Sequence, residues 1–462
     1  MKKRLLGLAG VAALGALALT SCQTGVNTGN VFHIYAWNQE FQGFFNTYLS
    51  DEKAEFQAIA KDLKDEKITE KEAEAKKPTT VHLDGKLVKW TIVPSDGGAY
   101  QKSLDEALLN NANAAPDEKV DLFLAEADYI LKYTDSDYTR DVTEIGVKDF
   151  SNIYNYTKEA ASDLKGVVKG VSFQCCPAGV IYRRSVAKDV LGSDKPEDVQ
   201  AAISSWSKFD DVAAKMKAKG YYMTSSYAET YRAFSNNVTK AWVDANNKLQ
   251  FDDQITAWMN QAEKYVQNGY TLATCPGIWD DECTAQMFKT GKTFCYFGPA
   301  WYYNFCMGNA QDKEKGCFGD WGLVEGPAKY FWGGTWMLAA KGGDNDALVK
   351  KTMNAFINDY DLCYKLVENE GQFSNNQKAN QDYAATGKGN AFLGGQNDTA
   401  VYLELAKGIK FQNITMYDQY CNEGLQNKFA EYLKNPAKVS KEKALANFRE
   451  YIKTECPDVV VA

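Results

Sequence analysis

Strand-like and helix-like patterns alternate along most of the chain. Apolar residues recur at helical spacing in several segments, as from Ile255 to Val266, where the pattern stops at Gly269. Short runs rich in β-branched and aromatic residues occur at 31–35, 121–124, 178–182, 293–297, 321–324 and 335–339. Alternation of this kind is typical of α/β proteins. The sequence therefore predicts an α/β fold with largely parallel sheets.

Local patterns also predict where some elements begin and end. Asp84 and Gly85 lie between two β-prone runs, and this dipeptide favours a two-residue hairpin. Apolar residues from Leu348 to Cys363 predict one helix that ends before Gly371. The highly charged segment 51–77 is typical of a solvated helix face.

The amino terminus has the pattern of an export signal. Basic residues at positions 2–4 precede an apolar run over 5–20, which is too short for a comfortable membrane span. The run ends in Leu-Thr-Ser-Cys22, which resembles the bacterial lipobox, where cleavage leaves a lipid-modified cysteine as the first residue. Two acyl chains give stable membrane anchoring. We therefore expect a signal peptide at 1–21, a lipid on Cys22 and a flexible tether over 22–30.

Composition narrows the functional classes. The 462 residues carry a net charge of −8, which makes nucleic acid an unsuitable partner. His33 and His82 are the two histidines, so a histidine-rich metal centre cannot be built. The sequence contains no G-x-x-x-x-G-K-[ST] nucleotide loop. We expect neither a metal nor a cofactor.

The cysteine count suits an exported protein with disulfides. Eleven cysteines are present, and a lipid on Cys22 leaves an even number. Cys275 with Cys283, and Cys306 with Cys317, are close in sequence and flank turn-rich stretches. We expect these two pairs to form disulfides, although burial of the thiols in reduced form is an alternative.

Several stretches resemble one family of exported binding proteins. The run Asp121-Leu-Phe-Leu-Ala-Glu126-Ala-Asp128, the segment 171–190, the Gly-Pro-aromatic turn that ends at Trp301, and the segment 321–340 occur in the family's order. Together with the lipobox, they resemble the extracellular solute-binding proteins of bacterial carbohydrate ABC importers, the group that includes maltose-binding protein. The segment 171–190 departs from the family signature, since Arg183 follows Tyr182 where Asn or Asp is usual.

The resemblance implies a two-lobed periplasmic-binding-protein-like α/β fold. In that fold a central ligand cleft lies between the lobes, and the chain crosses between them three times. We expect lobe one to comprise 31–166 and 334–388, and lobe two to comprise 167–333 and 389–462.

Sugar binding needs flat aromatic platforms for C–H faces and fixed polar groups for hydroxyls. Carboxylates and amides that could accept from hydroxyls are Asn38, Glu40, Asp96, Glu126 and Asp128. The resemblance suggests Tyr227, Trp301, Trp336 and Tyr417 as platforms. Trp37, Trp242 and Trp332 are further candidates, whereas Trp258 lies on an apolar helix stripe and is assigned to the core.

The resemblance further implies a receptor without catalytic residues. It would capture a sugar or oligosaccharide outside the cytoplasm, remain on the membrane through its lipid, and deliver the ligand to ABC permease subunits. Three alternatives stay open: an exported glycoside hydrolase, for which 280–282 is the densest acidic cluster, a binding protein for a metal ion or polyamine, and a surface adhesin.

Overall fold

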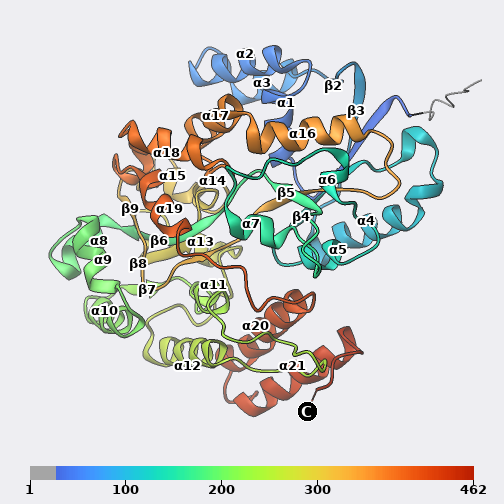
Figure 1. Ribbon diagram of the computed structural model, residues 1–462. Coiled ribbons are helices and arrows are strands. Elements are labelled where there is room, and N and C mark those ends of the chain that lie inside the picture. Colours follow the sequence, from blue (N-terminus) through green and yellow to red (C-terminus); the bar gives the residue numbers. More distant parts are fainter. Residues whose placement is uncertain (1–27, 462) are drawn as a thin grey trace, which may run out of the picture.

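Two β-sheets organise the computed structural model, which describes residues 28–461 (Figure 1). The first sheet has the strand order β2-β3-β1-β4-β11-β5, and β1 runs parallel to both β3 and β4. At the other end of this sheet, β11 runs antiparallel to β4 and β5. Its strands are β1 (Val31–Ala36), β2 (His82–Leu83), β3 (Lys86–Ile92), β4 (Leu122–Glu126), β5 (Gly170–Ser172) and β11 (Thr335–Ala339).

Helices cover both faces of this sheet and build lobe one. One face packs against α1 (Glu40–Tyr48), α6 (Val142–Ile145), α16 (Asp346–Asn358) and α17 (Tyr360–Glu370). The other face packs against α4 (Ala99–Asn110), α5 (Ile130–Thr134) and α7 (Asn155–Ala160). The charged helices α2 (Lys53–Lys64) and α3 (Glu70–Lys76) lie at the outer end of the lobe (Figure 1). Because apolar side chains point from both sheet faces, lobe one has a core on each side.

The second sheet has the order β10-β6-β8-β7, with β9 also paired to β6. Its strands are β6 (Pro177–Arg183), β7 (Tyr222–Thr224), β8 (Thr293–Gly298), β9 (Trp321–Val324) and β10 (Tyr330–Phe331). The prediction of largely parallel sheets is wrong here, since β8, β9 and β10 all run antiparallel to β6. The reason is topological: β6 leads away from the first sheet, whereas these three neighbours run back toward it.

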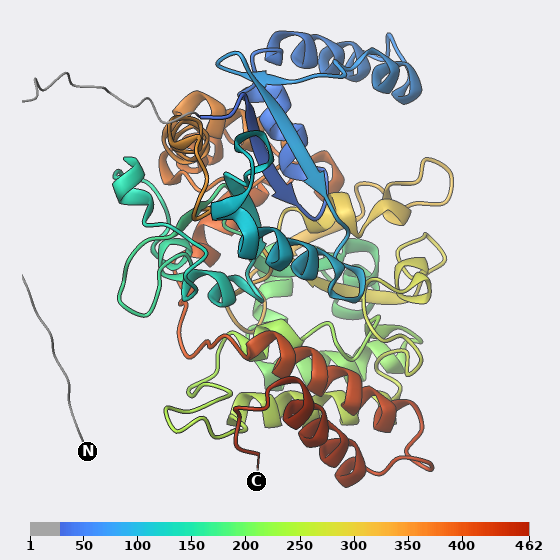
Figure 2. The ribbon, with the colours of Figure 1, turned by 90° about the vertical axis from the view of Figure 1, so that its right-hand side faces the viewer.

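Helices again cover both faces of the second sheet. On one face lie α8 (Arg184–Leu191), α9 (Pro196–Ile203) and α10 (Trp206–Ala218). On the other face lie α14 (Tyr302–Phe305), α15 (Gly308–Gln311) and α19 (Asp398–Ala406), with α13 (Asp281–Ala285) and α18 (Gln377–Ala385) nearby. A separate helical layer joins α11 (Tyr231–Ser235), α12 (Asp253–Asn268), α20 (Asp418–Lys434) and α21 (Lys441–Glu455) around its own apolar cluster (Figure 2).

Several predicted elements are confirmed, and one is corrected. The hairpin at Asp84 and Gly85 joins β2 to β3, and α12 ends with Gly269 in the left-handed conformation. The predicted single helix over 348–363 is wrong, because the chain breaks at Asp359 into α16 and α17. Asp359 has an extended backbone, and its carboxylate accepts from the amide of Leu362 at 3.1 Å. A side-chain cap therefore starts a second helix within one apolar stripe.

The chain crosses between the sheets at three segments, 173–176, 332–334 and 371–376. Two of them lie side by side, since Gln174 forms a bridge with Ser374. The amide of Cys175 donates to the carbonyl of Phe373 at 3.1 Å, and that of Asn375 donates to Phe173 at 3.0 Å. We call 173–175 with 373–375 the hinge ribbon. Since β5 pairs within the first sheet, the first crossing follows Ser172; the predicted lobe boundaries remain predictions.

The cysteine pairs differ from one another. The predicted Cys275–Cys283 disulfide is confirmed. The predicted Cys306–Cys317 disulfide is wrong, because both residues are free and buried in one apolar cluster, where the Cys317 thiol contacts the carbonyl of Met287 at 3.1 Å. Closeness in sequence does not by itself give the Cβ spacing that a disulfide requires.

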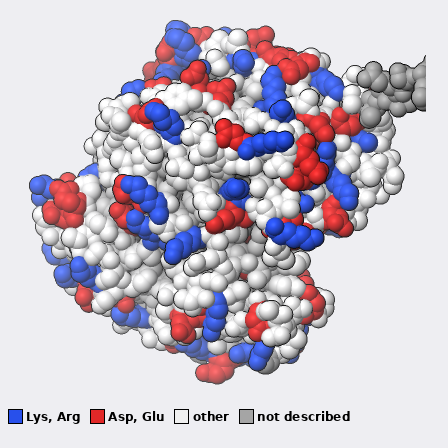
Figure 3. All heavy atoms as spheres, in the orientation of Figure 1, with Lys and Arg blue, Asp and Glu red and all other residues white. Residues whose placement is uncertain are grey.

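Acidic and basic side chains are intermixed on the face shown in Figure 3. Within residues 28–461, no helix has both the length and the apolar character needed to cross a bilayer. The signal peptide and Cys22 lie outside the described residues.

Candidate functional site: a cleft between the lobes

A cleft of about 520 Å³ lies between the two lobes. This volume is within the range of small-molecule sites, about 300–1,000 Å³. Lobe one supplies the loops after β1 and β4 and the start of α1, whereas lobe two supplies α11, the loop 276–279 and the turn after β8. The lining residues include Trp37, Asn38, Glu40, Glu126, Asp128, Gln174, Glu229, Tyr231, Arg232, Trp279, Trp301, Phe305, Trp332, Thr335, Glu423 and Gln426.

Four tryptophans converge on this cleft. Trp301 is central: its indole N–H donates to the carbonyl of Trp332 at 3.2 Å, and the two rings meet at 67° with centroids 5.2 Å apart. Trp279 lies parallel to Trp301, with ring planes 5° apart and centroids at 6.4 Å. Trp37 lines the cleft from lobe one and contacts Tyr100 edge-on. The cleft thus offers several flat apolar surfaces.

Glycines bring the backbone close to these rings. Gly333 and Gly334 have φ of +71° and +117°, conformations that L side chains rarely adopt. A Cβ atom on Gly333 would meet the ring of Trp301 at 3.4 Å, and one on Gly334 would meet Trp336 at 3.0 Å. The positive φ values therefore favour glycine at both positions of the crossing 332–334, and a side chain on Gly334 would also crowd the ring of Trp336.

An ion pair joins the two lobes across the cleft. Asp128, two residues after β4, accepts both terminal nitrogens of the Arg232 guanidinium from α11. The guanidinium also lies 6.0 Å from the ring centroid of Trp332. Although burial disfavours the charged guanidinium, Asp128 raises the pKa of Arg232 above its ordinary value. This pair fixes the geometry of one end of the cleft.

Glu40 connects the cleft to the hinge ribbon. It is the first residue of α1, and the amide side chains of Gln174 and Gln372 approach its two carboxylate oxygens at 3.4 and 3.3 Å. Burial raises the pKa of Glu40 to about 7, while these two amides oppose the shift. Within the described residues, the side-chain oxygen of Gln174 has no hydrogen-bond partner. Gln174 also lines the cleft, but this oxygen is itself buried in the structure.

Two further carboxyls in the cleft wall titrate near neutral pH. Burial, and then the negative charge of Asp128, raise the pKa of Glu126 to about 8, whereas Arg232 opposes the shift. Burial also raises the pKa of Glu229 to about 7, and its carboxyl accepts from the hydroxyl of Ser225 at 3.1 Å. Near pH 7 these groups can therefore act as donors as well as acceptors toward hydroxyls.

The raised pKa of Glu126 predicts a pH-dependent stability. Between its ordinary pKa of 4.5 and about 8, the folded protein retains a proton that the unfolded chain has released. This stabilising contribution is complete below about pH 4.5 and is lost as the pH rises through about 8. We expect Glu126→Gln, which cannot titrate, to reduce the loss of unfolding free energy between pH 5 and 8.5 by about 1–2 kcal/mol.

Chemical unfolding at a series of pH values measures this difference. Glu106→Gln, which changes an exposed carboxyl on α4, is the matched control and should follow the unaltered protein. Identical pH profiles for Glu126→Gln and the unaltered protein would contradict the prediction.

The structure brings five of the nine candidate ligand residues together. Asn38, Glu40, Glu126, Asp128 and Trp301 all line the cleft. Of the further candidates, Trp37 and Trp332 also line it. Trp242 and the core residue Trp258 instead pack within the helical layer of α11, α12, α20 and α21.

The other four candidates do not line the cleft. Trp336 is buried beneath Gly334, and its indole N–H donates to the carbonyl of Thr157 at 2.8 Å. Tyr227 is buried in the helical layer. Tyr417 precedes α20, with its hydroxyl bound to Asp458, and Asp96 lies in an exposed turn before α4. Each has a structural role that its residue type alone does not distinguish from ligand binding.

Several cleft residues carry little signal in the sequence. Arg232 and Glu229 lie in a segment without a clear periodic pattern, and Gln174 lies in the hinge ribbon. Trp279 directly precedes the acidic cluster 280–282. An isolated tryptophan between two cysteines was the one local signal that could have indicated it.

This architecture defines a class of protein: a two-lobed binding protein in which a solute is held between the lobes. The family model of the bacterial extracellular solute-binding protein matches residues 84–382. Since the match covers more than half of the chain, the protein belongs to this family. Its members are binding proteins, and the chain is therefore a binding protein rather than an enzyme.

Solved structures share this fold at low sequence identity. An extracellular solute-binding protein of family 1 has a TM-score of 0.70 and 16% identity, with 92% of this chain and 99% of that chain covered. The ABC transporter-associated binding protein of B. animalis subsp. lactis, in complex with β-1,6-galactobiose, has a TM-score of 0.61 and 15% identity, with coverages of 93% and 97%. The binding protein of Bifidobacterium longum in complex with lacto-N-biose has a TM-score of 0.62 and 13% identity, with coverages of 94% and 99%. No curated protein matches the sequence.

Proposed function

We propose that this protein captures a sugar or oligosaccharide in the interlobe cleft and delivers it to the permease of an ABC importer. A lipid on Cys22 holds the receptor at the outer surface of the membrane. Ligand binding favours closure of the lobes, and the closed form docks on the permease. Neither ligand nor receptor undergoes covalent change.

The observation that carries this proposal is the convergence of four tryptophans with several carboxyls in one cleft. A pyranose has apolar C–H faces that stack on indole rings, and a rim of hydroxyls that pair with carboxyls and amides. Trp301 and Trp332 supply the first kind of contact, and Glu40, Glu126 and Gln174 supply the second. A site with this composition suits a neutral, ring-shaped, hydroxyl-rich ligand.

The comparisons support the same ligand class. The two bifidobacterial proteins of this fold were solved with disaccharides bound. A binding protein of T. maritima solved with maltose has a TM-score of 0.59 to this chain. The family match supports a location outside the cytoplasm, and the lipobox supports the membrane anchor.

A thermal-shift screen of the purified protein tests the sugar assignment. A ligand that binds only the folded state adds about 2.7 kcal/mol to the unfolding free energy at a hundredfold excess over Kd. We expect a rise in melting temperature with one group of mono- or oligosaccharides, and isothermal titration calorimetry then gives the Kd. Polyamines and divalent metal ions in the same plate are the matched comparison. A shift with these ligands, and none with saccharides, would refute the assignment.

A further inference from the structure

Trp279 is an exposed tryptophan at the rim of the cleft. Its side chain is 69% exposed, whereas every other tryptophan among residues 28–461 is buried or half-buried. It belongs to the loop between Cys275 and α13, on the side of lobe two. Trp279 nevertheless lines the cleft, so its exposed ring is within reach of a bound ligand. Its ring is parallel to that of Trp301, which makes the two indoles a pair.

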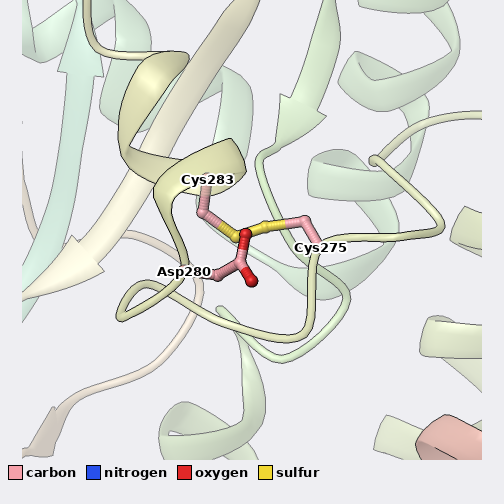
Figure 4. Close-up of side chains that lie close together, drawn as sticks. All are labelled: Cys275, Asp280 and Cys283. Carbon is pink, nitrogen blue, oxygen red and sulfur yellow. A yellow bond between two sulfur atoms is a disulfide. The ribbon is translucent and has the colours of Figure 1, made fainter.

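The loop that carries Trp279 is closed by the Cys275–Cys283 disulfide (Figure 4). Both cysteines are fully buried, and the hydroxyl of Ser226 donates to the carbonyl of Cys275 at 3.0 Å. The carboxylate of Asp280 accepts from the amide of Glu282 at 2.9 Å and so caps α13. The loop is therefore fixed at both ends, while the indole between them projects into solvent.

The same three residues also have a spacing that could suit a metal ion. Atoms of Cys275, Asp280 and Cys283 lie within 4.8 Å of one another. The two sulfur atoms are bonded to each other, however, so they offer no pair of thiolates (Figure 4). The role of this group is thus to shape the loop.

We propose that Trp279 is a second sugar platform facing Trp301, and that the Cys275–Cys283 disulfide holds it in position. This inference rests on the proposed sugar-binding function. Two van der Waals contacts between a sugar ring and two indoles require about 7–8 Å between the planes. The two rings are parallel with centroids 6.4 Å apart, so their planes are at most 6.4 Å apart, and a sugar enters only after Trp279 moves outward by at least about 1 Å. Because the side chain of Trp279 is exposed, it can make this movement. The disulfide that closes its loop limits how far it moves.

A ring held between two indoles must present C–H bonds on both faces. A pyranose with all hydroxyls equatorial does so, whereas an axial hydroxyl would point into one indole without a hydrogen-bond partner. The pair therefore selects pyranoses of the gluco or xylo configuration over manno or galacto epimers. This names the ligand class more narrowly than the proposed function does.

Calorimetric titration with β-1,4-linked cellotriose, xylotriose and mannotriose tests the selectivity. We expect the unaltered protein to bind cellotriose or xylotriose at least tenfold more tightly than mannotriose, and Trp279→Ala to lose most of this difference. Tighter binding of mannotriose would overturn the inference. If mannotriose binds more tightly although the thermal-shift screen shows saccharide binding, only the inference about Trp279 fails. If the unaltered protein binds no saccharide at all, the proposed function fails as well.

A double-mutant cycle tests the role of the disulfide. We expect Cys275→Ser/Cys283→Ser to weaken binding of the preferred trisaccharide about tenfold, and Trp279→Ala to weaken it by a similar factor. The triple variant, which combines the two cysteine substitutions with Trp279→Ala, should show no further loss. The other cysteines among the described residues are free, so a reductant acting on the unaltered protein should reproduce the loss. Reoxidation should restore the affinity, which separates this effect from misfolding.

Phe318→Ala is the matched control, because Phe318 is an exposed aromatic residue that does not line the cleft. Its affinity should equal that of the unaltered protein. Full affinity in the doubly substituted cysteine variant, or additive losses in the triple variant, would overturn the role assigned to the disulfide.

Discussion

Replacing Trp301 with alanine is expected to weaken saccharide binding about a hundredfold, which corresponds to about 2.7 kcal/mol. The indole lies at the centre of the cleft, in contact with Trp332 and parallel to Trp279. Its removal deletes one platform and the hydrogen bond to the carbonyl of Trp332, so the neighbouring ring also loses its support. Calorimetric titration with the best ligand from the screen measures the change.

Trp301→Phe is the matched variant for this test. It keeps a flat ring but removes the indole N–H, so we expect a loss of about tenfold or less. Thermal unfolding of both variants should remain close to that of the unaltered protein, since Trp301 is only half-buried. An affinity unchanged in Trp301→Ala would remove this residue from the binding site.

Replacing Arg232 with methionine is expected to lower the unfolding free energy by about 2 kcal/mol. The substitution leaves Asp128 without its partner and beside Glu126, in a wall with limited solvent access. Removing one member of a fully buried ion pair costs about 3–5 kcal/mol. The side chains of Arg232 and Asp128 are 22% and 19% exposed, so we expect a smaller effect. Denaturant unfolding at neutral pH measures it.

The double variant Asp128→Asn/Arg232→Met provides the control. It removes both charges, so it should recover much of the stability lost in the single Arg232→Met variant. Equal losses in the single and double variants would show that the ion pair has no special role and that the packing of the arginine stem explains the change.

Much of the fold follows from local sequence patterns. The apolar runs predicted as strands correspond to β1, β4, β6, β8, β9 and β11, and the stripe from Ile255 to Val266 lies in α12. These predictions succeed because strand and helix periodicity depend on burial of one segment at a time. The direction of the strands in the second sheet depends on how the chain crosses between lobes, and local periodicity does not contain that information.

The site was predictable only in part, for a related reason. Glu126 ends a buried strand, Asp128 lies two residues beyond it, and Trp301 follows a Gly-Pro turn after another strand, so both places present side chains where a strand ends. Trp336 is different: all five residues of β11 are buried, and alternation along the strand cannot distinguish the cleft side from the core side. Arg232 reaches the cleft through its pairing with a residue 104 positions earlier, which no short pattern reveals.

The hinge ribbon constrains how the cleft can open. Segments 173–175 and 373–375 exchange backbone hydrogen bonds, so one cannot bend without the other. A two-stranded ribbon of this kind twists about its long axis more readily than its strands slide past each other. We therefore expect the lobes to move mainly by rotation about this ribbon. Opening would separate Glu126 on one wall from Trp279 on the other and would have to break the Asp128–Arg232 ion pair, so a ligand that touches both walls would favour the closed form.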